Sequence, residues 1–131
     1  MVNLLDLIAR IFISLIFLFS GVSKIITYDA TFQWMEQGSV PGFFLIPAIA
    51  LEIIAPVLII IGYKTRLAAA SLSLFCLATA FLFHFDFSNH IQIIAFLKNI
   101  GLTGGLLFLT CECLNYQFQH ANACMISVNK G

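Results

Sequence analysis

A single carboxylate, Glu52, lies near the middle of a long apolar run from Phe43 to Tyr63. A run of about twenty apolar residues is long enough to cross a membrane as a helix. A glutamate at the centre of such a helix costs roughly 2.5–3.5 kcal/mol on insertion scales, and it usually faces protein or a cavity. We therefore expect other residues of the chain to compensate this charge.

Four cationic or imidazole side chains in the other apolar segments are candidates to face Glu52. At 1.5 Å per residue from each segment's centre, Arg10 lies roughly 7 Å to one side of the midplane and Lys98 roughly 7 Å to the other. Both are long enough to reach towards Glu52. On the side of Lys98, His84 lies roughly 10 Å from the midplane and Lys24 near the membrane edge.

A cavity lined by these groups is net positive if all of them are ionised. Such a site favours an anion or an electron-rich carbonyl such as that of a quinone, and it stabilises the negative charge that develops when a quinone is reduced. The candidate ligand-binding residues are Glu52, Arg10, Lys98, Asn99, His84 and Lys24. No catalytic residue is assigned, and no metal site is predicted.

A purely structural interpretation stays open beside this one. In it, Arg10 and Glu52 form a buried pair, while Lys24 and Lys98 extend to the membrane interface. His84 is then a hydrogen-bonded histidine of the core or the interface.

The composition is that of a membrane protein with one folding unit, residues 1–131. Of the 131 residues, 61% are hydrophobic and 9% are charged, whereas soluble domains have about 25% charged residues. The zero net charge and the lack of a basic run argue against nucleic acid as a partner. The four cysteines form no C-x-x-C motif, which argues against a thioredoxin-like pair, a zinc site or a covalently attached haem.

Four segments are predicted to span the bilayer, which gives an all-α, integral membrane four-helix bundle. They are residues 4–26, 43–63, 67–87 and 91–113, and the tail 114–131 is predicted to be loosely ordered. Between the first two spans, Asp29 is positioned to cap a short interfacial helix that Gly38 and Pro41 end. This helix either covers one mouth of the bundle or lies at the interface only.

Three local patterns predict how the spans pack. Ser14, Gly21 and Lys24 each lie within about 40° of Arg10 on a helix, so this stripe is expected to face neighbouring helices. Pro56 leaves the backbone carbonyl of Glu52 without its usual helical donor, which favours a kink and a polar pocket there. Gly101-x-x-x-Gly105 is a close-packing signature of transmembrane helices.

Four spans place both termini on one side of the membrane. That side holds Arg10, Lys64, Arg66 and Lys130, whereas the other holds Lys24 and Lys98 near span ends. The positive-inside rule therefore predicts that the N- and C-termini are both cytoplasmic.

Several short motifs follow one another along the chain. They are Leu7-Ile-Ala-Arg10, Phe19-Ser-Gly21-Val-Ser-Lys24, Gly38-x-x-Pro41, Leu51-Glu52, Ile61-Gly62-Tyr63-Lys64-Thr65-Arg66, His84, and Phe96-Leu97-Lys98-Asn99 followed by Gly104-Gly105. In this order and spacing they resemble the DoxX family, in particular its small bacterial inner-membrane branch. The resemblance ends near Leu109: many members continue with Gly-Pro-Gly and Ser-Leu-Asp, whereas this chain has Thr110-Cys-Glu-Cys113.

The resemblance implies a multi-pass protein of the bacterial inner (plasma) membrane with cytoplasmic termini. The family takes its name from a subunit of a quinol oxidase and thiosulfate:quinone oxidoreductase system, and other members are linked to thiol or quinone stress. A quinone is thus the candidate cofactor, and a quinone-linked oxidoreductase component is the enzyme class implied. Distant relatives act as cargo receptors or assembly chaperones, so a non-enzymatic scaffold, with a protein partner or a second copy, is the alternative.

Overall fold

The computed structural model describes residues 3–128, and this part of the chain contains helices and no strand. The elements are α1 (Leu4–Ile26), α2 (Tyr28–Gln37), the 3-10 turn η1 (Gly42–Phe44), α3 (Leu45–Ile61), α4 (Thr65–Phe83) and α5 (His90–Val128). Within these residues, four segments are long and apolar enough to cross a membrane: α1, η1 with α3, α4 and α5. The predicted all-α bundle with a short helix between its first two spans is confirmed.

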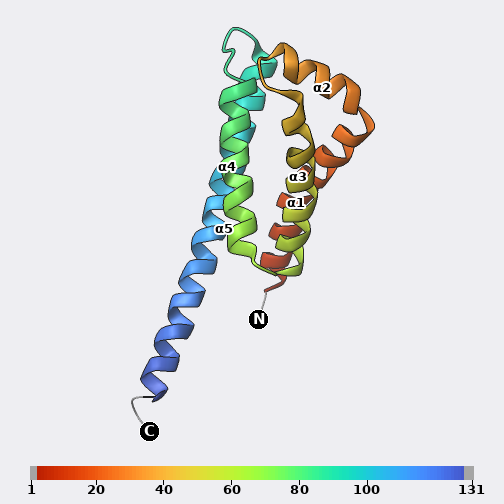
Figure 1. Ribbon diagram of the computed structural model, residues 1–131. Coiled ribbons are helices and arrows are strands. Elements are labelled where there is room, and N and C mark those ends of the chain that lie inside the picture. Colours follow the sequence, from red (N-terminus) through yellow and green to blue (C-terminus); the bar gives the residue numbers. More distant parts are fainter. Residues whose placement is uncertain (1–2, 129–131) are drawn as a thin grey trace.

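The span boundaries differ from the prediction by a few residues because of local turns. Gly62 ends α3 with φ 84°, a conformation that glycine adopts without strain, and Lys64 precedes α4 with φ 47°. At the other end of α4, His84 is the C-cap, so the helix stops at Phe83 rather than at Phe87. Figure 1 shows the start of α1, the turn between α3 and α4, and the C-terminal end of α5 on the same side of the bundle.

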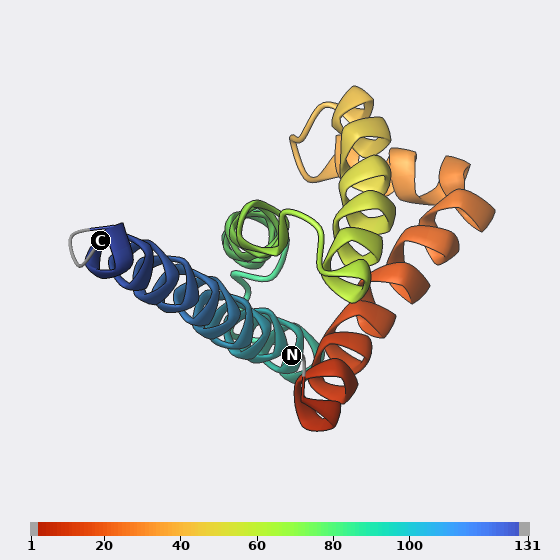
Figure 2. The ribbon, with the colours of Figure 1, turned by 90° about the horizontal axis from the view of Figure 1, so that it is seen from below.

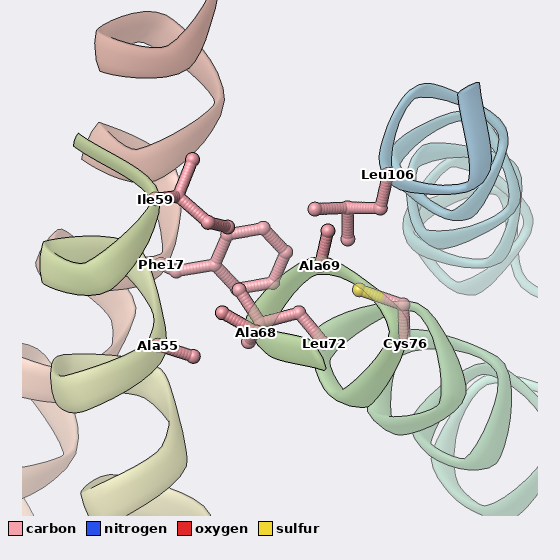
Figure 3. Close-up of a cluster of buried hydrophobic side chains, with 8 residues drawn as sticks. All are labelled: Phe17, Ala55, Ile59, Ala68, Ala69, Leu72, Cys76 and Leu106. Atoms are coloured by element: carbon pink, nitrogen blue, oxygen red, sulfur yellow. The ribbon is translucent and has the colours of Figure 1, made fainter. Parts of the chain in front are cut away.

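The long helices lie side by side in the order α1, α3, α4, α5, with α4 between α3 and α5 (Figure 2). Their shared core is built from Phe17 of α1, Ala55 and Ile59 of α3, Leu106 of α5, and four residues of α4 (Figure 3). The α4 residues are Ala68, Ala69, Leu72 and Cys76. Alanine at two of these positions lets neighbouring side chains approach the α4 backbone closely.

The polar stripe of α1 faces α3, as its spacing predicted. The Arg10 guanidinium donates to the carbonyl of Ile59 at 3.4 Å, and the Ser14 hydroxyl donates to the carbonyl of Pro56 at 3.2 Å. Further along, a Cβ added at Gly21 would lie 3.0 Å from Cγ1 of Ile53. Gly21 therefore permits the close approach of the two helices.

Helix α5 is 39 residues long and differs from the prediction at its C-terminal end. The tail was expected to be loosely ordered after Leu114, but the helix continues through Val128; residues 129–131, with Lys130, lie outside the described part. No glycine or proline interrupts residues 114–128, so nothing in this segment ends the helix. The predicted close packing holds for Gly105, whose added Cβ would lie 3.3 Å from Ile13, and not for Gly101, which has nothing within 4 Å.

The connection between α4 and α5 is held by side-chain bonds to the backbone. The Asp86 carboxylate accepts from the hydroxyl and from the backbone N–H of Ser88, and these two hydrogen bonds hold the pKa of Asp86 below its ordinary value. The Asn89 side-chain oxygen accepts from the N–H of Ile91 at 3.0 Å and so caps the start of α5.

Candidate functional site

A cavity of about 520 Å³ lies between the helices in the half of the bundle nearer α2. All five α-helices contribute to its lining, which is mainly aliphatic and aromatic. The polar and ionisable side chains that line it are Ser20, Lys24, Thr31, Glu52, Cys76, Thr79, His84, Lys98 and Asn99. An apolar cavity of this volume with a few convergent polar groups is typical of small-molecule sites.

Glu52 is compensated by Lys24 and not by Arg10. The Lys24 ammonium donates to the two carboxylate oxygens of Glu52 at 2.8 and 2.7 Å, and to the hydroxyl of Ser20 at 2.7 Å. The Ser20 hydroxyl in turn donates to Glu52 at 3.2 Å. Since an ammonium has three N–H donors, all donors of Lys24 are used within this cluster.

Burial explains why the cluster is so tightly bonded. Glu52 is 3% exposed, whereas the side chain of Lys24 is 26% exposed. A buried carboxylate is tolerated only when a charge partner and hydrogen bonds replace its lost hydration. Lys24 thus reaches from near the end of α1 into the bundle, contrary to the expectation that it extends to the interface.

Arg10 lies outside the cavity. It donates to the Asp6 carboxylate at 3.0 Å, in an ion pair, and to the Thr65 hydroxyl at 3.2 Å, near the start of α4. The expected approach of Arg10 to Glu52 is therefore wrong. The arginine joins α1 to the end of α3 and the start of α4 instead.

Lys98 and Asn99 of α5 form the opposite wall of the cavity. Asn99 donates from Nδ2 to the Thr79 hydroxyl at 3.4 Å. Within residues 3–128, the two ion pairs join Arg10 to Asp6 and Lys24 to Glu52. Lys98 is thus the lysine of the cavity lining whose ammonium is not paired with a carboxylate in this part of the chain.

Helix α2 covers the end of the cavity next to His84. It contributes Thr31, Trp34 and Met35 to the lining, and Met35 is buried. The Trp34 ring stacks on Phe83 of α4 with 4.8 Å between ring centroids. Of the two roles left open for this helix, the structure therefore supports the covering one.

Comparison with known proteins agrees with this architecture. The DoxX family profile matches residues 5–85, which is more than half of the chain. The chain belongs to the DoxX family. The match runs from α1 through α4 and thus includes Lys24, Glu52 and His84.

Two Escherichia coli proteins are similar to this DoxX-family chain. Inner membrane protein YqjF is 41% identical over 103 residues, and inner membrane protein YphA is 34% identical over 110 residues. Each alignment covers 79% of this chain and 79% of the relative. No solved structure matches the chain.

Most of the candidate residues lie together in the DoxX-family cavity. Glu52, Lys24, Lys98, Asn99 and His84 all line it, whereas Arg10 does not. Their role in ligand binding stays a prediction, because their position alone does not show what they bind.

Three neighbours of the candidate residues were not predicted. Ser20 bonds to Lys24 and Glu52, Thr79 bonds to Asn99, and the Gln92 side-chain oxygen lies 2.6 Å from Nδ1 of His84. Ser20 had a sequence signal: it is four residues before Lys24 and so lies on the same helix face. Thr79 and Gln92 had no comparable signal, because neither bonds within its own helix. Thr79 of α4 bonds to Asn99 of α5, and Gln92 of α5 bonds to His84 at the end of α4.

Proposed function

We propose that this DoxX-family chain is an inner-membrane protein that binds one small, largely apolar molecule in the cavity beside Glu52. The ligand is quinone-like or lipid-like: it has an electron-rich oxygen at one end and an apolar remainder. The membrane assignment is supported by the four apolar helices and by the names of the two Escherichia coli relatives.

The observation that carries the proposal is Lys98, an exposed lysine at a mainly apolar cavity that has no carboxylate partner within residues 3–128. Lys24 has no free donor for a ligand, because Glu52 and Ser20 accept all three of its N–H groups. Lys98 has its ammonium donors available, and beside it Asn99 has a second N–H. These groups suit a carbonyl or phosphate oxygen, and hydrogen bonds to a charged donor contribute about 1.5–3 kcal/mol.

The rest of the cavity suits the apolar part of such a ligand. Ile16, Leu51 and Leu102 line it from three different helices, and Phe75 and Leu82 line it from α4. Burying a methylene group there contributes about 0.8 kcal/mol.

A role in a membrane redox or thiol-stress system follows if the ligand is a quinone. A positive charge beside the quinone oxygen stabilises the negative charge that appears on reduction. This is a binding role, and no residue of the chain is assigned as catalytic.

Quinone binding by the protein in lipid nanodiscs tests the proposal, with a benzoquinone that carries a ten-carbon tail as the probe. A single-chain phospholipid in a parallel titration distinguishes the two ligand classes. We expect Lys98→Gln to weaken binding of the preferred probe by about tenfold, which corresponds to about 1.4 kcal/mol. Lys64→Gln, a matched change in the turn between α3 and α4, leaves the affinity unchanged.

Two results would contradict binding in this cavity. One is that neither probe binds and that native mass spectrometry of the purified protein shows no retained small molecule. The other is that Lys98→Gln binds both probes with the affinity of the unchanged protein.

A second candidate function is a non-enzymatic scaffold or assembly partner in the membrane. The observation that favours it is the complete saturation of the Lys24 donors by Glu52 and Ser20, as in a cluster that only fixes helix packing. The double variant Lys24→Gln with Glu52→Gln removes both charges of the pair. If it folds well and keeps its protein partners, whether or not a ligand is present, this function is supported. If the same double variant folds well but no longer binds the ligand, the scaffold function is excluded.

A further inference from the structure

One face of α5 is apolar along the whole helix. Beginning at Ile93 and ending at Val128, alternating steps of four and three residues always reach an apolar residue or a glycine. In the second half of the helix these positions are Leu107, Cys111, Leu114, Phe118, Ala121 and Met125. We call the whole set the α5 seam. A repeat of 3.5 residues that is sustained over several heptads is the pattern of a helix that pairs in a coiled coil.

Most of the α5 seam is exposed, and none of its residues is buried, although Ile93 and Leu114 are partly buried. Helix α5 packs into the bundle through other residues, of which Thr103 and Leu106 are buried. By contrast, the seam residues Leu97 and Phe118 are 60% and 69% exposed. At Gly104, also in the seam, an added Cβ would have no heavy atom within 4 Å.

Lipid accounts for the exposure of only the first half of the α5 seam. A helix of 39 residues is about 58 Å long, whereas the apolar core of a bilayer is about 30 Å thick. Figure 1 shows that the C-terminal part of α5 extends beyond the ends of the other helices. Phe118, Met125 and Val128 in this part are exposed, and nothing in residues 3–128 covers them.

We propose that the α5 seam pairs with the α5 seam of a second copy of this chain, in a parallel two-helix coiled coil that reaches to Val128. Copies that insert into a membrane in the same orientation have their α5 helices parallel. In a parallel pair, each seam residue meets its own counterpart, so an all-apolar seam is complementary to itself.

The residues that flank the α5 seam are also compatible with two identical helices. Residues 113–128 contain no aspartate, glutamate, lysine or arginine. The flanking positions Asn115, Gln117 and Asn122 therefore bring no like charges together across the pair. Within the membrane half, Gly104 lets the two backbones approach closely.

Cysteine positions make the pairing measurable. Cys111 lies in the α5 seam, where it faces Cys111 of the second copy across the two-fold axis. Cys113 is two residues further along and so lies about 200° around the helix, facing away from the seam. Cys76 is buried in the core of the bundle and can be left in place.

The first test is disulfide crosslinking of the full chain in liposomes at a low protein-to-lipid ratio. One variant keeps Cys111 (Cys113→Ser with Cys124→Ser), and its matched control keeps Cys113 (Cys111→Ser with Cys124→Ser). Added copper–phenanthroline with oxygen accepts two electrons from the two thiols, whose protons pass to water as the S–S bond forms. We expect the Cys111 variant to form a crosslinked dimer at least about tenfold faster than the Cys113 variant. Equal rates, or no dimer from Cys111, would overturn the proposal.

The second test distinguishes pairing through the α5 seam from other contacts between copies. Phe118→Asp places a charge in the seam, whereas Gln119→Asp places the same charge on the next residue, outside it. We expect the molecular mass in detergent to fall from dimer to monomer for Phe118→Asp only, with unchanged helix content by circular dichroism. Two results contradict the pairing. One is that the protein without substitutions is a monomer, in which case the seam binds a different partner. The other is that the Phe118→Asp variant is still a dimer.

Discussion

At the scale of single residues, the site depends on how one buried carboxylate is neutralised. Glu52 is almost inaccessible, and its oxygens accept from the Lys24 ammonium and the Ser20 hydroxyl. Lys24 is the more exposed partner, with a flexible stem that can reach water. The two members of the pair are therefore not equivalent: removing the lysine leaves a deeply buried anion, whereas removing the glutamate leaves a cation that can move outwards.

The first prediction concerns this asymmetry. We expect Lys24→Gln to lower the free energy of unfolding by about 3 kcal/mol, because breaking a buried pair leaves an uncompensated charge. Glu52→Gln should lower the free energy of unfolding clearly less than Lys24→Gln does. The double variant should lower it by less than the sum of the two single changes. Unfolding in mixed micelles with increasing denaturing detergent measures all three.

Glu112→Gln is the matched control for this cycle, because it changes the same group at an exposed position of α5. It should leave the unfolding curve unchanged. Additive effects of the two single changes would show that Lys24 and Glu52 do not interact in the folded protein.

At the scale of elements, the contact of α1 with α3 sets the geometry of the cavity. Arg10, Ser14 and Lys24 bond to α3 at successive levels, and Gly21 keeps the two backbones close between them. If the helices moved apart at Gly21, the Lys24 ammonium would move away from Glu52. The shape of the site is thus determined by a glycine that touches no ligand.

A pair of glycine substitutions tests this role. We expect Gly21→Ala to destabilise the fold by about 1–3 kcal/mol, because the new methyl group would lie 3.0 Å from Cγ1 of Ile53 and 3.3 Å from Cβ of Glu52, closer than ordinary contact. Gly101→Ala enters open space and should be neutral or stabilising by up to about 1 kcal/mol, since alanine favours the helix more than glycine does. Thermal melting in detergent compares the two, and equal effects would contradict the close approach at Gly21.

At the scale of the whole molecule, the start of α1, the end of α5 and the turn between α3 and α4 share one side of the bundle (Figure 1). Lys64 lies in this turn and Arg66 in the first turn of α4. From the positive-inside rule we therefore predict that this side is cytoplasmic. The connection with Ser88, between α4 and α5, then lies on the outer side. The α5 extension and its proposed pairing are cytoplasmic in this orientation.

Cysteine labelling tests the orientation. A membrane-impermeant maleimide should label Ser88→Cys in intact cells, or in cells of which only the outer membrane has been permeabilised. Lys64→Cys should be labelled only after the membrane is permeabilised, and so should the native Cys124, which is exposed and lies outside the α5 seam. The reverse labelling pattern would place the termini outside.

The sequence by itself determined the membrane character, the number of spans within residues 3–128 and the face of α1 that meets a neighbour. These features depend on local composition and helical periodicity, which any single helix carries in its own residues. Five of the six candidate residues line one cavity. For Glu52 the reason is local too, because a charge within an apolar helix turns towards the bundle interior.

Only the tertiary structure decided which charges meet. Depth measured from the centre of each span placed Arg10 roughly 7 Å from the midplane and Lys24 near the membrane edge, and so favoured Arg10 as the partner of Glu52. Such a depth ignores how far one helix is shifted along the next. The packing of α1 on α3 fixes this shift, and it brings Lys24 to Glu52 while Arg10 reaches Asp6 and Thr65. A contact between helices depends on both partners at once, and neither helix encodes it alone.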